Sequence, residues 1–398
     1  MIGLLSSRKY TWPLNVVIFN VCRLFPLRNN KIWVFGAREG YQFDENARYL
    51  FEYIISHDNG GVRCVWLTRS DDVIISMREK GYDVYKCNSL KGIFYSLRAG
   101  VAFYTNGLVD FGVLPLVGGA EIVSLWHGVG FKRIYNAKYK GWKYKVKCMM
   151  DRAFSWTYRT ITIATSEYNS WQFAQSFLYG KNHMTFIAGQ PRNDIFKQNL
   201  QKEKVLSMLS LDFSKRVIIY MTTYRGKDMG ENAMENIIRT LYESDRLNEV
   251  LDKEKCVFIA KLHPLTPHID LPRRENFVIL DYGEVDSNQE LLGVSDMLIT
   301  DYSSCCVDFA LLNRPIIFYQ PDEKDFMKKS EPLYEELLDI LHTNRCTTPD
   351  ELAESILNPT LEAVNKINDV FEDESIRGTC YSENVYKVIC DEIGLQDK

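Results

Sequence analysis

The 398-residue sequence lacks the motifs that mark several common classes of nucleotide- and metal-dependent enzyme. It contains no GxxxxGKS or GxxxxGKT phosphate loop and no GxGxxG fingerprint, so neither a P-loop nor the usual dinucleotide-binding turn is expected. It has no HExxH pair and no zinc-type spacing of cysteine and histidine. No Asp-x-Asp pair occurs, so a carboxylate-held divalent ion at a nucleotide diphosphate is not supported. We therefore predict no bound metal and no cofactor.

A membrane-spanning run is also missing. Residues 10–27 are apolar and aromatic, but Pro13, two asparagines and an arginine interrupt them. They fall short of the roughly 18–20 uninterrupted apolar residues that a spanning helix needs, and no A-x-A-like cleavage site follows. Two interpretations stay open for residues 1–30: a helix that lies in the membrane surface, or an arm that packs on the first domain.

Charge and cysteine usage give no sign of an unusual class of protein. The formal net charge is −4, which gives no overall indication of nucleic-acid binding. The ten cysteines have no CxxC spacing, and Cys305 and Cys306 are adjacent, so reduced thiols in the cytoplasm are the simplest interpretation. Hydrophobic content of 46% and aromatic content of 13% are typical of a well-packed globular protein.

Short apolar runs alternate with helical patterns in both halves of the chain, which predicts βαβ units and mostly parallel sheets. We expect two α/β halves joined near residue 200, the architecture of a two-domain transferase with its site in the cleft. The predicted parts are an N-terminal peripheral segment, a first α/β domain, a second α/β domain and a last helix, over residues 1–30, 31–200, 201–375 and 376–398. Strands are predicted at 31–36, 62–68, 82–86, 101–105, 121–126, 161–166 and 184–187, and again at 216–223, 256–262, 277–280, 297–300 and 316–319.

Residues 131–160 of the first domain carry an excess of basic and aromatic side chains. Nine lysines and arginines stand against one acidic residue, Asp151. Most charge runs are the solvated face of a helix, but this composition also fits an anionic lipid surface or a polyanionic acceptor. Nucleic acid would fit the charge, but no DNA- or RNA-binding motif accompanies it, so no nucleic-acid partner is predicted.

Residues 297–319 have the pattern of a strand, a polar turn, a helix and a second strand. Asp301 to Ser304 offers small polar residues of the kind that begin a helix, and a helix N-terminus at the carboxyl end of a parallel sheet attracts an anion. Ser303 and Ser304 suit a phosphate or pyrophosphate, whereas Asp308, one turn later, suits a hydroxyl or an imidazole. The alternative is a capped core helix whose serines only close its first turn.

Histidine is scarce, with six in the chain, so the position of each one is informative. His127 follows a predicted first-half strand, at the edge where open α/β sheets bind ligands. An imidazole there is a candidate general base near neutral pH, although a lone histidine is more often a structural residue. Gly128 next to it permits a tight turn.

Three neighbouring strand ends of the second half carry groups that suit a phosphate. Lys261 and His263 follow one strand on the same side, Thr223 and Arg225 follow another, and the serine pair follows the third. An arginine can form two hydrogen bonds to a phosphate. Without a metal, charge neutralisation would fall to Arg225, Lys261, His263 and the helix N-terminus.

Several of these motifs occur in a fixed order along the chain. They are Trp126-His127-Gly128 with Lys132, Gly189-Gln190-Pro191-Arg192-Asn193-Asp194, Thr223-Tyr224-Arg225, Lys261-x-His263-Pro264 and Ile299-Thr300-Asp301-Tyr302-Ser303-Ser304 with Asp308. Together they resemble the CDP-glycerol glycerophosphotransferase family, the teichoic-acid primases and polymerases and their relatives in capsule synthesis. The resemblance runs from about residue 31 to the C-terminus, and the Asp-Tyr-Ser-Ser block is its most specific part.

The resemblance implies a GT-B-like α/β fold, with two Rossmann-type domains whose parallel sheets face each other across a cleft. The first domain would be the acceptor side and the second would bind the donor. It also implies a cytoplasmic enzyme attached peripherally to the inner face of a bacterial cell membrane. Its reaction would transfer glycerol phosphate from CDP-glycerol to a hydroxyl of a glycan or lipid-linked acceptor, releasing CMP without an obligatory metal.

Mapped by motif, the resemblance implies a role for each site residue. His127 would be the base on the acceptor hydroxyl. His263, Ser304 and Asp308 would hold the donor's phosphates and glycerol, with His263 and Asp308 also among the catalytic residues. Arg225 and Lys261 would offset charge on the leaving CMP. The other implied substrate-binding residues are Gly128, Lys132, Arg192, Asn193, Asp194, Thr223, Asp301 and Ser303.

Two motifs depart from the family's pattern. The family often has Trp-His-Gly-Thr-Pro-x-Lys, whereas Val129-Gly130-Phe131-Lys132 follows the glycine here, and Pro-Thr-Trp-Arg appears as Thr222-Thr223-Tyr224-Arg225. The acceptor therefore stays open, and so does the alcohol on CDP, because ribitol-phosphate transferases share these motifs. Alternatives are a CDP-ribitol transferase, a GT-B glycosyltransferase that uses a sugar nucleotide, and a non-enzymatic membrane-docking scaffold. Oligomeric state, including a homo-oligomer, also stays open.

Overall fold

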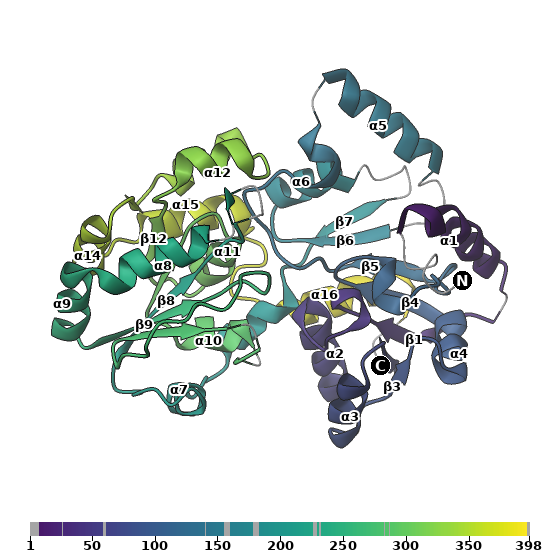
Figure 1. The fold of residues 1–398 in the computed structure, drawn as a ribbon. Coiled ribbons are helices and arrows are strands. Elements are labelled where there is room, and N and C mark those ends of the chain that lie inside the picture. Colours follow the sequence, from purple (N-terminus) through teal and green to yellow (C-terminus); the bar gives the residue numbers. More distant parts are fainter. Residues whose placement is uncertain are drawn as a thin grey trace. The chain divides into compact units, whose positions relative to one another are not determined.

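The computed structural model describes residues 8–25, 27–58, 61–139, 141–154, 160–177, 183–225, 229–230, 232–281, 283–285 and 287–395 (Figure 1). The chain divides into two compact units, and each is built on its own parallel sheet. Unit 1 comprises Met1–His127, Tyr139–Asp194 and Glu374–Lys398, and unit 2 comprises Gly128–Lys138 and Ile195–Asp373.

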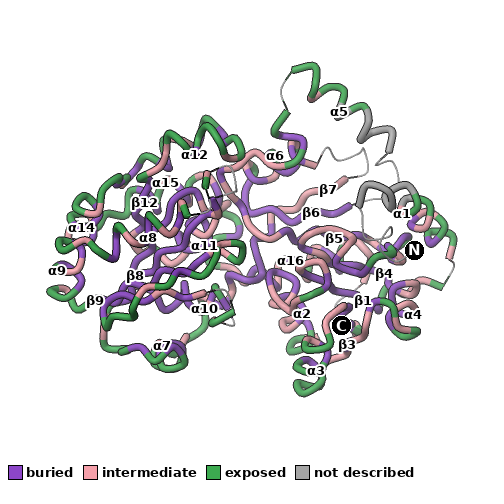
Figure 2. Tube along the Cα trace, viewed as in Figure 1, coloured by how far each residue is buried: buried purple, intermediate pink, exposed green. Residues whose placement is uncertain are grey.

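In the described part of unit 1, seven parallel strands form one sheet in the order β3-β2-β1-β4-β5-β6-β7. The strands are β1 (Asn29–Phe35), β2 (Arg63–Thr68), β3 (Val84–Lys86), β4 (Ala99–Tyr104), β5 (Glu121–Ser124), β6 (Thr160–Ala164) and β7 (Met184–Ile187). The helices are α1 (Arg8–Arg23), α2 (Glu45–His57), α3 (Asp71–Glu79), α4 (Leu90–Arg98), α5 (Gly141–Phe154), α6 (Glu167–Phe177) and α16 (Tyr381–Glu392). Strands β2, β4, β5 and β6 are buried almost throughout (Figure 2), as expected for a parallel sheet covered on both faces.

Aromatic side chains fill the core of unit 1. Phe35 stacks on Phe103 with ring centroids 4.6 Å apart, and Phe51 meets Trp66 edge to face at 5.7 Å. Helix α16 packs on α2, and its apolar side chains belong to the same core. The chain therefore returns to unit 1 after completing unit 2.

In the described part of unit 2, six parallel strands have the order β10-β9-β8-β11-β12-β13. The strands are β8 (Arg216–Met221), β9 (Cys256–Lys261), β10 (Phe277–Leu280), β11 (Met297–Thr300), β12 (Ile316–Tyr319) and β13 (Arg345–Cys346). The helices are α7 (Lys202–Met208), α8 (Ala233–Glu243), α9 (Asp245–Lys253), α10 (Asn288–Val294), α11 (Cys305–Ala310), α12 (Glu323–Lys329), α13 (Leu338–Leu341), α14 (Pro349–Leu357) and α15 (Glu362–Phe371).

Both sheets have the strand order of the Rossmann fold, 3-2-1-4-5-6, with one further strand in unit 1. The order reverses between β1 and β4 in unit 1 and between β8 and β11 in unit 2. In open α/β sheets, ligands bind outside the carboxyl ends of the strands at this reversal. The predicted fold class, an α/β protein with two parallel Rossmann-type sheets, is confirmed.

Two features differ from the prediction. Gly128–Lys138 belongs to unit 2, although the sequence placed it in the first domain. In addition, β13 and the helices α9, α12 and α15 were not predicted. A two-residue strand has no readable periodicity.

Helix α1 has two different faces. Phe19 and Cys22 are buried against unit 1, which agrees with a packing arm. Leu14, Val17 and Val21 are each about half exposed and recur at helical spacing, which agrees with an interfacial helix. Among the described residues, we find no helix with the length and apolarity needed to span a bilayer.

Candidate active site

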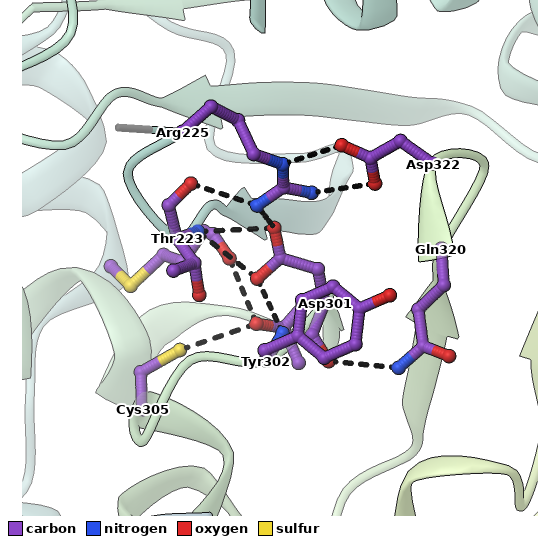
Figure 3. A network of polar contacts seen from close by, with 9 residues as sticks. Thr223, Arg225, Asp301, Tyr302, Cys305, Gln320 and Asp322 are labelled. Atoms are coloured by element: carbon purple, nitrogen blue, oxygen red, sulfur yellow. Dashed lines mark hydrogen bonds and ion pairs between the residues drawn. The ribbon is translucent and has the colours of Figure 1, made fainter. Parts of the chain in front are cut away.

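The polar cluster of unit 2 is centred on Asp301, which directly follows β11 and is fully buried (Figure 3). Its two carboxylate oxygens accept the backbone N–H of Thr223 at 3.0 and 3.1 Å. Its Oδ2 also accepts from Nη1 of Arg225 at 2.6 Å. The carboxylate therefore ties the turn after β8 to the turn after β11, across the reversal of strand order.

Arg225 lies between two carboxylates. Besides Asp301, it contacts Asp322 through Nε at 2.7 Å and through Nη2 at 3.1 Å, and its side chain is only 2% exposed. Burial alone would raise the pKa of Asp301, but Arg225 and the N–H donors hold that pKa below its usual value. Both edges of the guanidinium thus bind protein groups. Arg225 therefore stabilises the turns that follow β8 and β11.

Ser303 and Ser304 occupy the turn between Asp301 and helix α11. Both serines are partly exposed, and Ser303 Oγ lies 3.5 Å from the backbone N–H of Cys305, which begins the helix. Asp308, by contrast, is 2% exposed. The serines are therefore accessible at this strand end, whereas Asp308 belongs to the buried side of α11.

Lys261 is the last residue of β9 and His263 follows that strand, next to the turn after β8. Lys261 is buried, and its ammonium donates to the backbone oxygen of Asp281 at 2.5 Å. His263 Nδ1 accepts the backbone N–H of Leu265 at 3.1 Å, and its ring stacks on Tyr224 with centroids 5.5 Å apart. Because Nδ1 accepts, the proton of the neutral imidazole is on Nε2, and His263 is a donor there.

Lys132 belongs to unit 2, beside the Asp301–Ser304 turn. Its ammonium lies over the ring of Phe326, 5.4 Å from the centroid, and that ring stacks on Tyr302 at 3.7 Å. Burial lowers the pKa of Lys132, while Asp301 acts in the opposite direction. A Cβ on Gly130 would meet the Cβ of Ser304 at 3.1 Å, so this segment closely approaches the serine turn. Lys132, predicted in the first domain, is thus a cation of unit 2.

His127 follows β5 in unit 1 and is held through Nδ1. This nitrogen lies 3.0 Å from the backbone oxygen of Thr105, which can only accept, so Nδ1 carries the proton and Nε2 is the acceptor. Asp110 fixes this partner by accepting the backbone N–H groups of Thr105 and Asn106, both at 2.8 Å. Burial lowers the pKa of His127, so the imidazole stays neutral at a lower pH than is usual for histidine.

Arg192 lies beside His127 in unit 1. It is buried, and its Nη1 donates to the backbone oxygen of His127 at 3.0 Å and to Glu45 Oε2 at 2.5 Å. Glu45 is 6% exposed and also pairs with Arg38. The sequence predicted Arg192 as a substrate ligand and did not single out Glu45, because an acidic residue at the start of a helix normally indicates only a favourable helix dipole.

The other residues of the predicted Gly189–Asp194 motif fasten helix α16. Asp194 accepts the backbone N–H groups of Tyr381 and Ser382 at 2.7 Å each, at the start of that helix. Gly189 has a φ of +85°, and a Cβ there would lie 2.1 Å from the Tyr381 ring. Asn193 is buried, and its backbone N–H donates within the motif to the backbone oxygen of residue 190 at 3.0 Å. In the structure these contacts of the motif fasten α16 to unit 1.

Two further predictions concern metals and charge. Among the residues that the structure describes, no group of three or more histidine, cysteine, aspartate and glutamate side chains is placed to hold a metal ion.

Within the basic stretch of residues 131–160, Trp142 and Met149 of α5 are exposed, as are Lys143 and Lys145. Lys140 and Arg159 lie outside the described residues.

The comparisons with known proteins point to one family. Residues 17–376 match the model of the family described as CDP-Glycerol:Poly(glycerophosphate) glycerophosphotransferase. The chain is 27% identical over 390 residues to a teichoic acid poly(glycerol phosphate) polymerase of Bacillus spizizenii, covering 92% of each protein. It is 26% identical over 355 residues to a teichoic acid poly(ribitol-phosphate) polymerase of the same organism, covering 87% of this chain but only 54% of that relative.

Solved structures share the fold. The wall teichoic acid polymerase TagF superposes with a TM-score of 0.74 over 96% of this chain and 93% of that chain, at 22% identity. The S. aureus MnaA–UDP structure has a TM-score of 0.54 over 93% of this chain and 98% of that chain, at 12% identity. At these identities the likeness concerns the fold alone.

Proposed function

The chain belongs to the CDP-glycerol:poly(glycerophosphate) glycerophosphotransferase family, and from this premise we propose that it transfers glycerol phosphate from CDP-glycerol to a hydroxyl of a teichoic-acid- or capsule-type glycan precursor. The observation that carries the proposal is the pair of histidines at strand ends, held in opposite tautomers. His127 offers a proton acceptor at Nε2, and His263 offers a proton donor at Nε2. His127 can therefore activate an alcohol, and His263 can bind a phosphate oxygen.

In the proposed reaction, His127 Nε2 takes the proton of the acceptor hydroxyl. The alcohol oxygen then attacks the phosphorus that carries glycerol. A new P–O bond forms, the bond between the two phosphates breaks, and CMP leaves with the electron pair. His263, Lys132 and the serines at 303 and 304 bind the donor's phosphate oxygens and offset the charge that develops there.

A CDP-ribitol donor is the second candidate. The relative named as a poly(ribitol-phosphate) polymerase supports it, because its identity to this chain nearly equals that of the glycerol-phosphate relative. Both donors present the same diphosphate, so the residues above would act in the same way on either. A glycosyltransferase that uses a sugar nucleotide has weaker support, in the fold shared with the UDP-bound structure.

We also propose peripheral attachment to the inner face of a bacterial cell membrane. Exposed apolar side chains on α1 and exposed tryptophan and lysine side chains on α5 are suited to an anionic interface. Binding to vesicles with anionic lipid should weaken steeply between low and high salt, because basic residues contribute to it. Salt-insensitive binding would count against the charge contribution, and no binding would exclude the docking itself.

A donor screen with purified protein tests the proposed activity. CDP-glycerol, CDP-ribitol and UDP-sugars are offered with a glycan acceptor, and CMP or UDP release is measured. We expect CMP release from a CDP-polyol, and a loss of about 10²- to 10⁴-fold in kcat in His127→Ala. His57→Ala is the matched control, because His57 is an exposed histidine of the same unit and should leave the rate unchanged. Release from UDP-sugars only, or normal turnover in His127→Ala, would refute the proposed reaction.

A further inference from the structure

The backbone around His127 is strained. Arg38, Glu45 and Trp126 all have left-handed conformations, with φ of 49°, 62° and 53°. Residues with a Cβ rarely adopt this region, and such strain persists only where surrounding contacts enforce it. The loop that carries His127 is therefore held in place at an energetic cost.

The contacts that hold it come from the first two residues of α2. Asn46 is fully buried, and its Nδ2 donates to the backbone oxygens of Leu125 and Trp126 at 3.1 and 3.0 Å. Its Oδ1 accepts the backbone N–H of Arg192 at 3.1 Å. The Arg192 guanidinium then joins the Glu45 carboxylate to the backbone oxygen of His127. Both sides of the histidine are thus fastened to the start of one helix.

The same network surrounds the imidazole with charge. Arg38 and Arg192 are cationic and Glu45 is anionic, and Asp110 acts through the Thr105 backbone. Although Glu45 is buried, the two arginines hold the pKa of its carboxylate below the usual value, so it stays ionised. A fixed negative charge beside a histidine favours the imidazolium, whereas the arginines and the loss of solvent disfavour it.

We propose that Glu45 is a positioning residue for His127: with Arg192 it fixes the loop that carries the imidazole, and its charge stabilises the imidazolium that forms when the acceptor hydroxyl loses its proton. The inference rests on the proposed function, in which His127 is the base. The proton moves from the hydroxyl oxygen to Nε2 and stays there until CMP has left. Glu45 remains ionised throughout and neither donates nor accepts a proton.

Histidine titration in the 398-residue chain tests this independently of turnover. Protein labelled at histidine is titrated by NMR, and His127→Asn identifies the signal of His127. In Glu45→Gln the midpoint of His127 should fall by about one pH unit, because a favourable charge is removed. In Arg38→Gln it should rise, because an unfavourable charge is removed. Glu52→Gln is the matched control, since it lies on the same helix but pairs with Arg48.

Activity and folding data complete the test. In Glu45→Gln, kcat should fall at least about tenfold and the acidic limb of the pH profile should move to lower pH, with KM for CDP-glycerol within about twofold. A folded Glu45→Gln protein whose His127 midpoint is unchanged overturns the proposal, even if its activity is lost. Should that variant not fold, Arg38→Gln decides, because its side chain is 37% exposed; an unchanged midpoint there overturns the proposal too. Shifted midpoints without any CMP release in the wild type would refute the proposed function and leave the positioning role standing.

Discussion

The strand-end clusters of the two units contain the same kinds of residue, a histidine, an arginine and buried carboxylates, but present opposite groups. In unit 1 the Thr105 carbonyl accepts a hydrogen bond from Nδ1–H of His127, so the other ring nitrogen, Nε2, carries no proton in the neutral imidazole. In unit 2 Nδ1 of His263 accepts a hydrogen bond from the backbone N–H of Leu265, so the proton of the neutral imidazole is on Nε2. A single local hydrogen bond therefore decides whether a histidine can act as a base or as a donor.

The arginines of the two clusters, in contrast, have the same kind of role. Arg192 and Arg225 are both buried, and each binds a buried carboxylate and a backbone oxygen. The sequence predicted Arg225 as a phosphate ligand and Arg192 as a substrate-binding residue, whereas in the structure both guanidinium groups fasten loops. Arg225 holds the serine turn of unit 2, and Arg192 holds the histidine loop of unit 1. The proposed reaction takes place at these two segments.

The largest expected effect is on stability, and it tests whether Arg225 supports the turns or binds a phosphate of the donor. Arg225→Gln leaves Asp301 buried without its cation, and it should lower the free energy of unfolding by about 3–5 kcal/mol in urea denaturation. Arg239→Gln is the control, because it removes an exposed pair with Glu235 and should change stability far less. Normal stability together with a large rise in KM for the donor would instead identify Arg225 as a phosphate ligand.

A smaller effect distinguishes the two histidines by donor binding. His263→Ala removes a hydrogen bond to a charged group and should weaken CDP-glycerol binding about 10- to 100-fold in calorimetry. His127→Ala should bind the donor normally, because its role concerns the acceptor hydroxyl. His342→Ala, an exposed histidine of unit 2, serves as the control. Equal losses of donor affinity at both sites would contradict the assigned division of roles.

The smallest expected effect concerns the motif that fastens α16. Asp194→Ala removes the acceptor for two backbone N–H groups and should destabilise the protein by about 0.5–2 kcal/mol in thermal or urea unfolding. The donor KM should not change. Glu383→Ala, which removes an exposed carboxylate from the first turn of the same helix, should cost less. A raised donor KM at full stability would restore the role predicted from the sequence.

Local patterns were sufficient to predict the fold. Strands β7, β10, β11 and β12 have the predicted bounds, because a buried parallel strand is a short apolar run with polar residues at its ends. The same logic placed His127, Lys261 and the serine pair at strand ends. Such information lies within a few consecutive residues.

The roles of the charged residues depend on partners that are distant in sequence. Arg192 meets Glu45 across 147 positions, and Asp194 meets Tyr381 across 187. Nothing near Glu45 in the sequence distinguishes it from an ordinary acidic helix start. Lys132 was placed in the first domain for the same reason, because its contacts with Phe326 and Leu333 of unit 2 are distant in sequence.

The return of α16 to unit 1 has a consequence for biosynthesis. Val385 and Ile389 belong to the core formed by Trp33 and Phe35, so the strands made first stay incompletely covered until residues 381–392 have left the ribosome. Unit 2, whose last residue is Asp373, can finish beforehand. The core of unit 1 is therefore completed only by the last helix of the chain, which is synthesised after every element of unit 2.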